Sequence, residues 1–151
     1  MIAPRVIVTW SILTNIPNYK HTTTTRPGLR KRPGLSGQMK TTYHLDFETY
    51  SEADLRSFGA YRYASDPSTE ILIMAIAKED GQPVLWDSVN GGDEAVDIFR
   101  AASAPGNTIY AHNAQFEAAV CKYKCLPTFG FEAPPLENWL CTSAMARRAA
   151  I

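Results

Sequence analysis

The feature that most constrains the fold is a run of seven apolar residues from Ile71 to Ala77, with no polar side chain in it. A continuous apolar run of this length is expected for a central strand that is covered on both faces. Asp80-Gly81 follows the run and is a strong signal for a hairpin turn, so Pro83–Trp86 is predicted to be the returning strand. The chain is therefore expected to build a sheet with a buried centre.

A second strand is predicted before this run, because polar and apolar residues alternate from Thr42 onwards. Alternation with a period of two places successive side chains on opposite faces of a strand. One face carries Tyr43, Leu45 and Phe47, and the other carries His44, Asp46 and Glu48. A loop is predicted over Ser51–Thr69, and the first three strands are expected to form an antiparallel meander.

The second half of the chain predicts helices on either side of a short strand, Thr108–Ala111. Asp93 is expected to cap the first helix and Asn113 the second, which Pro127 should bound. The apolar positions expected on their inner faces are Ala95, Ile98, Phe99 and Ala102, then Phe116, Ala119, Val120 and Tyr123. A last helix is predicted from Thr142 or Ser143. The order β-β-β-α-β-α is similar to that of an α/β fold of the ribonuclease H-like type.

Charge divides the chain into two parts. Residues 1–45 hold seven basic residues and no acidic one, which leaves 8 basic and all 15 acidic residues for 46–151. Residues 17–38, with the Thr22–Thr25 run and the basic cluster at 30–32, have few apolar groups to offset ordering entropy and are predicted to be disordered. Met39 resembles a start of translation. We therefore expect a basic extension over 1–38 and a folded domain over 39–151.

Several classes of protein are disfavoured by what the sequence contains. Cys121, Cys125 and Cys141 are odd in number and include no CxxC pair, so neither a disulfide framework nor a zinc ribbon is indicated. Reduced, half-buried thiols fit a cytoplasmic protein better. The apolar stretch Val6–Ile16 is too short for a membrane span of about 20 residues, so no membrane partner is expected.

Two groups of polar residues are candidates for chemistry. Asp46 and Glu48 are two apart on a strand and project from the same face, whereas Asn113 and Glu117 are four apart and share one face of a helix. Each pair has an ordinary explanation, as solvated acids on a strand and as a helix cap with a first-turn acid. Together they offer the hard oxygen ligands that Mg²⁺ and Mn²⁺ prefer, which predicts a two-metal site for phosphodiester chemistry.

The residues around these candidates resemble a known family. Leu45-Asp46-Phe47-Glu48-Thr49 is similar to the first exonuclease motif of the DEDD superfamily, as found in the proofreading domains of phage and bacterial family A DNA polymerases. The segment from Ala111 to Glu117 is similar to the second motif, and the segment 58–72 resembles the phage-type members. The resemblance covers about residues 40–151.

The resemblance implies a 3′→5′ exonuclease that acts on single-stranded DNA ends with two Mg²⁺ or Mn²⁺ ions. Asp46 would bridge both ions, Glu48 would hold one ion and orient the attacking water, and Glu117 would contact the second ion. The side chains that would hold the 3′-terminal nucleotide are Thr49, Asn113 and Phe116.

The chain departs from the family pattern at two points. Glu117 stands where the second motif usually has Asp, and the Tyr or His followed four residues later by Asp that forms the third motif is missing before Ile151. These departures predict a domain that is incomplete at its C-terminus and impaired in activity. The alternative is a catalytically silent nucleic-acid-binding or interaction fragment, which would act with a polymerase module elsewhere. Tyr61 and Tyr63 are candidates for stacking on bases, although packing within the fold is the favoured interpretation for both.

Overall fold

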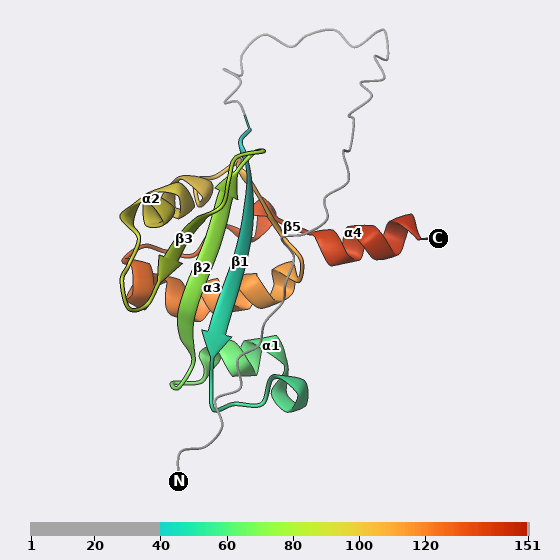
Figure 1. Ribbon diagram of the computed structural model, residues 1–151. Helices are drawn as coiled ribbons and strands as arrows, with labels where there is room; N and C mark the ends of the chain where they lie inside the picture. The colour runs from blue at the N-terminus through green and yellow to red at the C-terminus, as the bar shows by residue number, and fades with distance from the viewer. Residues whose placement is uncertain (1–39, 151) are drawn as a thin grey trace, which may run out of the picture.

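The computed structural model describes residues 40–150, and these form one mixed α/β layer structure. The predicted extension over 1–38 lies outside the described residues. A five-stranded sheet has the order β3-β2-β1-β4-β5. Its strands are β1 (Thr42–Tyr50), β2 (Glu70–Lys78), β3 (Val84–Asp87), β4 (Thr108–Ala111) and β5 (Trp139–Cys141). Figure 1 shows β1 crossing the middle of this sheet.

The first three strands form the predicted antiparallel meander. β1 pairs antiparallel with β2, and β2 pairs antiparallel with β3. On its other side β1 pairs with β4 in the parallel sense, and only Thr42 to His44 take part in that pairing. β1 therefore continues past the end of β4, so the segment that carries Asp46 and Glu48 has no strand partner on that side.

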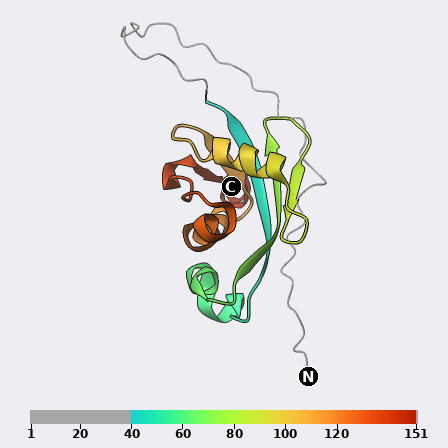
Figure 2. The same cartoon turned by 90° about the vertical axis from the view of Figure 1, so that its left-hand side faces the viewer.

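Three helices cover one face of the sheet, as Figure 2 shows in edge view. They are α1 (Leu55–Ser65), α2 (Asp93–Ala102) and α3 (Ala114–Phe129), and a short 3₁₀ turn (Leu136–Asn138) precedes β5. Side chains from all three helices join one hydrophobic core with those of β1, β2 and β4. A further helix, α4 (Thr142–Ala149), begins where it was predicted to begin but buries none of its residues, and it projects away from the sheet in Figure 1.

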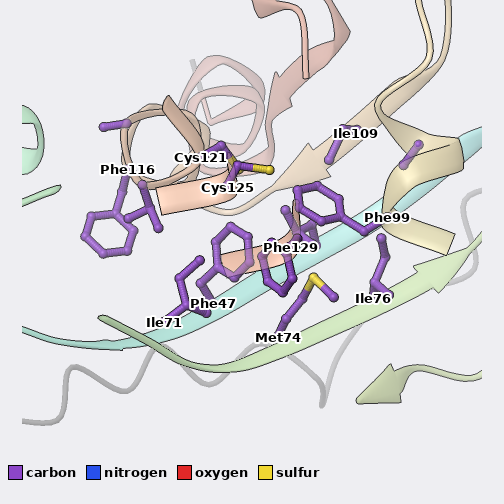
Figure 3. Close-up of a cluster of buried hydrophobic side chains, with 14 of the residues drawn as sticks. Phe47, Ile71, Met74, Ile76, Phe99, Ile109, Phe116, Cys121, Cys125 and Phe129 are labelled. Atoms are coloured by element: carbon purple, nitrogen blue, oxygen red, sulfur yellow. The ribbon is translucent and has the colours of Figure 1, made fainter. Parts of the chain in front are cut away.

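The core lies between the sheet and α2 and α3, and aromatic rings fill much of it (Figure 3). The rings of Phe47 on β1 and Phe99 on α2 meet edge to face with their centroids 6.0 Å apart, and Phe129 of α3 packs against Phe99 at 5.5 Å. The alternation predicted for β1 is confirmed, because Tyr43, Leu45 and Phe47 are buried while His44, Asp46 and Glu48 are only half-buried.

The predicted loop over Ser51–Thr69 is wrong, because it contains α1. Asp54 caps this helix by accepting a hydrogen bond from the backbone N–H of Arg56 at 3.1 Å. Gly59 kinks the helix at a φ of 74° and a ψ of 170°, which interrupts the apolar periodicity that would have revealed it. Only Tyr63 and Ala64 of α1 are buried, and they pack into the common core.

The second half of the chain departs from prediction in several details. α3 continues through Pro127 for two more residues and ends at Gly130, which adopts the left-handed conformation of a C-cap. Tyr123 was expected on the inner face but is 38% exposed. Gly92, rather than Asp93, occupies the N-cap position of α2. β5 was not predicted, because three residues are too few to establish a pattern.

The two cysteines of α3 are more buried than predicted. Cys121 and Cys125 are 1% and 0% exposed, and both are free thiols. Burial raises the pKa of Cys121 well above its usual range, so this thiol is neutral and behaves as an apolar side chain. The third cysteine of the described residues, Cys141, is also a free thiol and is only half-buried.

Candidate functional site

The acids predicted on β1 lie on the face of the strand that turns away from the core. Asp46 is paired across the sheet with Ala75, and Glu48 with Ile73. These cross-strand partners are small or apolar, so they carry no charge that could offset that of the carboxylates. Desolvation by burial raises the pKa of Asp46, although the nearby charge of His112 acts in the opposite direction. Desolvation also raises the pKa of Glu48, and the charge of Asp46 adds to that rise.

Glu117 lies in the first turn of α3 and is the most deeply buried of the three acids, with 4% of its surface exposed. Burial raises its pKa to about 8, and the charge of Asp46 contributes in the same direction. The charge of Asp46 thus contributes to the raised pKa of both Glu48 on the same strand and Glu117 on α3. At neutral pH and without a cation, Glu117 is therefore mostly protonated.

Two carboxylate oxygens of this group have no hydrogen-bond partner among residues 40–150. Glu48 Oε2 and Glu117 Oε2 are both inaccessible to solvent and both unpaired. An orphaned buried oxygen costs free energy unless some group compensates it. Hard carboxylate oxygens in this condition fit a divalent cation such as Mg²⁺ or Mn²⁺.

The protein alone does not complete a metal site around these acids. Among residues 40–150, no three His, Cys, Asp or Glu side chains lie close enough together to hold an ion. The donor chemistry of Asp46, Glu48 and Glu117 thus fits the expected metals, while the number of converging ligands falls short. Mg²⁺ commonly takes only one or two protein carboxylates and completes its shell with water and substrate phosphate.

The residues predicted to hold the terminal nucleotide lie in two different environments. Thr49 and Phe116 are buried, with 1% and 3% of their surfaces exposed, whereas Asn113 is exposed. Thr49 Oγ1 forms a hydrogen bond of 2.9 Å with the hydroxyl of Tyr63, and the ring of Tyr63 packs on that of Phe116 at 5.8 Å. Thr49 and Phe116 therefore join β1 and α3 to α1. Tyr63 is a core residue, as the favoured interpretation held.

Asn113 occupies the N-cap position of α3, but its side chain makes no capping hydrogen bond. It lines an open pocket of about 560 Å³ together with His112 from the end of β4 and three residues of α4, Ser143, Ala146 and Arg147. His112 connects this pocket to the acids, since its charge acts on Asp46. Arg147 supplies a cation that suits an anionic ligand.

The α4 residues of this pocket were not predicted from the sequence. They lie about 30 positions beyond Asn113 in the chain and reach it because β5 pairs parallel with β4, from Ile109 with Trp139 to Ala111 with Cys141. His112 Nδ1 also lies 3.3 Å from Thr142 Oγ1, which fastens the start of α4 to the end of β4. A three-residue strand carries no sequence signal strong enough to predict this pairing.

Comparison with known proteins gives one finding about origin. Over 106 residues, which are 70% of this chain, the sequence is 30% identical to a protein described as a DNA polymerase from Bacillus phage SP02. The chain spans about 15% of the length of that polymerase. No family model matches the chain, and no solved structure matches it.

Within residues 40–150, no helix has both the length and the apolar character needed to cross a membrane.

Proposed function

We propose that residues 40–150 form a ribonuclease H-like 3′→5′ exonuclease domain of phage polymerase type, which acts on single-stranded DNA ends with Mg²⁺ or Mn²⁺. One observation carries the proposal. The unpaired, buried oxygens of Glu48 and Glu117 belong to a strand and a helix that are distant in sequence, and Asp46 acts electrostatically on both. A group of acids with raised pKa values is a candidate for a functional site.

Two further findings support this assignment. The meander β3-β2-β1, extended by the parallel strands β4 and β5, agrees with a ribonuclease H-like sheet. The similarity to a phage DNA polymerase favours DNA as the substrate and a polymerase module as the partner.

In the proposed reaction, a water oxygen bonds to the last phosphorus and the bond from phosphorus to the 3′ oxygen of the preceding nucleotide breaks. That oxygen takes up the proton that the water loses, and a nucleoside monophosphate leaves. Asp46, Glu48 and Glu117 would hold the metal ions, which when bound would stabilise charge on the attacking and leaving oxygens. Asn113 would orient the terminal nucleotide from the pocket beside His112, and Arg147 would pair with a phosphate there. Thr49 and Phe116 are buried and would act indirectly, by fixing the positions of Glu48 and Glu117.

The test is digestion of a 5′-labelled single-stranded oligonucleotide with Mg²⁺ or Mn²⁺. The parent is compared with Asp46→Asn/Glu48→Gln, and with Glu94→Gln/Asp97→Asn as a matched control that removes two exposed acids from α2. We expect a ladder of shortened products from the parent and the control, and none from the Asp46→Asn/Glu48→Gln variant or in EDTA.

The catalytically silent alternative is favoured by the missing group of three ligands within residues 40–150. It predicts no ladder from the parent but a rise in melting temperature with Mn²⁺ that Asp46→Asn abolishes. A parent protein with neither a ladder nor a Mn²⁺ response would contradict both forms of the metal-site proposal.

A further inference from the structure

Aromatic and basic side chains alternate on the outer surface of α1 and α3. The members of this aromatic–basic surface are Phe58, Tyr61 and Arg62 of α1, and Lys122 and Tyr123 of α3. The three rings are 56%, 46% and 38% exposed in chain order. Tyr61 thus differs from the buried Tyr63, although packing within the fold was predicted for both.

Each cation of this surface lies beside an exposed ring. The guanidinium carbon of Arg62 is 5.5 Å from the centroid of the Phe58 ring. Lys122 Nζ lies 5.6 Å from the Tyr61 centroid and 5.4 Å from that of Tyr123, so one ammonium group joins rings of two helices. Rings and positive charges are therefore interleaved at the distances of cation–π contacts.

The charge of these two helices is opposite to that of the rest of the domain. Residues 46–151 are acidic overall, yet α1 contains no acidic residue and the only one in α3 is the buried Glu117. Arg56 and Lys124 add to the positive charge, although Lys124 Nζ already donates to the Asp66 carbonyl at 2.8 Å. The acids that flank α1, Asp54 and Asp66, accept hydrogen bonds from neighbouring serines, which lower their pKa values, so both keep their negative charges at the ends of the helix.

This surface is fastened to the proposed active site. β1 runs toward α1, and α1 lies alongside α3 (Figure 1). Tyr63, which adjoins Arg62 in α1, bonds Thr49 beside Glu48 and packs on Phe116 beside Glu117. These packed contacts join the aromatic–basic surface to the acids, so a DNA strand bound to the surface would keep a fixed position relative to the acids.

We propose that the aromatic–basic surface binds the single DNA strand that leads to the 3′ end, an inference that rests on the proposed function for its substrate. Bases stack on the rings of Phe58, Tyr61 and Tyr123, and phosphates pair with Arg62 and Lys122. Stacking rings combined with a positive surface are the means by which proteins bind single strands without reading sequence. An acidic peptide would use the charges but would leave the three exposed rings without a function.

The test measures the binding of a fluorescein-labelled thymidine 12-mer by fluorescence anisotropy in EDTA, where no cleavage competes. The full chain is used, so that the basic segment 1–38 contributes equally to every variant. Phe58→Ser/Tyr61→Ser is compared with Val89→Ser/Leu136→Ser, which removes two apolar side chains elsewhere that are more exposed still. We expect the first pair to weaken binding by about tenfold or more, and the control pair to bind as the parent does.

Two further readouts separate bases from phosphates. An abasic oligonucleotide of the same length should bind the parent more weakly than the 12-mer does, and this difference should be smaller for Phe58→Ser/Tyr61→Ser, which keeps only the Tyr123 ring for stacking. Arg62→Gln/Lys122→Gln should reduce the slope of log affinity against log salt concentration by about 1.4, because each lost phosphate contact on a single strand contributes about 0.7.

The inference is overturned if folded variants of both kinds bind the 12-mer as the parent does. It is equally overturned if they change only the oligomeric state in gel filtration, which would make a second copy the occupant. Asp46→Asn/Glu48→Gln should retain binding in EDTA. Normal binding without any cleavage therefore contradicts the exonuclease proposal alone, whereas cleavage with binding that ignores the surface contradicts this inference alone.

Discussion

Asp54 and Glu117 are acids at the beginnings of two helices, and their environments are opposite. Asp54 is exposed, and its carboxylate accepts hydrogen bonds from the Ser57 hydroxyl and the Arg56 backbone N–H, which lower its pKa. Glu117 is buried, one of its oxygens has no partner, and its pKa is raised to about 8. Position at a helix N-terminus favours a negative charge in both cases. The difference teaches that burial, rather than the helix, decides which acid remains available for a ligand.

Replacing Glu117 should give the largest effect, a change in how the free energy of unfolding depends on pH. The folded pKa of Glu117 lies above its unfolded value of 4.5, so as pH rises from 4.5 toward 8 the unfolded chain ionises while the folded protein stays protonated. The parent therefore loses stability by about 1.4 kcal/mol per pH unit from this group, several kcal/mol in all. Glu117→Gln keeps the shape without this loss.

We expect Glu117→Gln to match the parent near pH 5 and to exceed it in free energy of unfolding by several kcal/mol near pH 8, measured by urea denaturation in EDTA. The difference between the two proteins isolates Glu117 from Asp46 and Glu48, whose raised pKa values affect both equally. A difference that does not change with pH would show that Glu117 is already ionised in the folded protein.

The second-largest effect should be that of Mn²⁺ on the melting temperature, because the pKa of Glu117 is raised. A metal ion competes with the proton for Glu117, so Mn²⁺ should raise the melting temperature more at pH 8.5 than at pH 6.5. A concentration of 100 times Kd corresponds to about 2.7 kcal/mol of stabilisation. Glu117→Gln should flatten this pH dependence, while Asp97→Asn, on the exposed face of α2, should leave it unchanged. An equal Mn²⁺ response at both pH values would separate Glu117 from the metal site.

The smallest effect should come from Asp54, whose partners are already in the protein. Asp54→Ala should lower the melting temperature at neutral pH by only a few degrees, because the helix loses the hydrogen bonds that Asp54 accepts from the Arg56 backbone N–H and the Ser57 hydroxyl. Since the folded pKa is lowered, this contribution is present above the usual pKa and disappears as pH falls through the folded value. The response to Mn²⁺ should stay as in the parent, and a loss of that response would mean that α1 takes part in the metal site.

The strands with strong patterns were predictable from the sequence, and the weak ones were not. β1 and the hairpin of β2 and β3 were found because each strand contributes several residues to one consistent pattern. α1 was missed because Gly59 kinks it and only two of its residues are buried. Pro127 was predicted to bound α3, but a proline in the last turn removes a single hydrogen bond, and the core contacts of Phe129 hold that turn in place.

By itself, the sequence determined which side chains could carry chemistry. Alternation put Asp46 and Glu48 on one face of β1, and the helical period put Asn113 and Glu117 on one face of α3. Only the tertiary structure decided the state of these groups. Burial removed the water that would have solvated Glu117, and the pairing of β4 with β5 brought Arg147 to Asn113. The packing of α1 on α3 likewise placed Lys122 between two tyrosines. Local patterns fix the direction of a side chain, whereas its solvation and distant neighbours depend on how the whole chain packs.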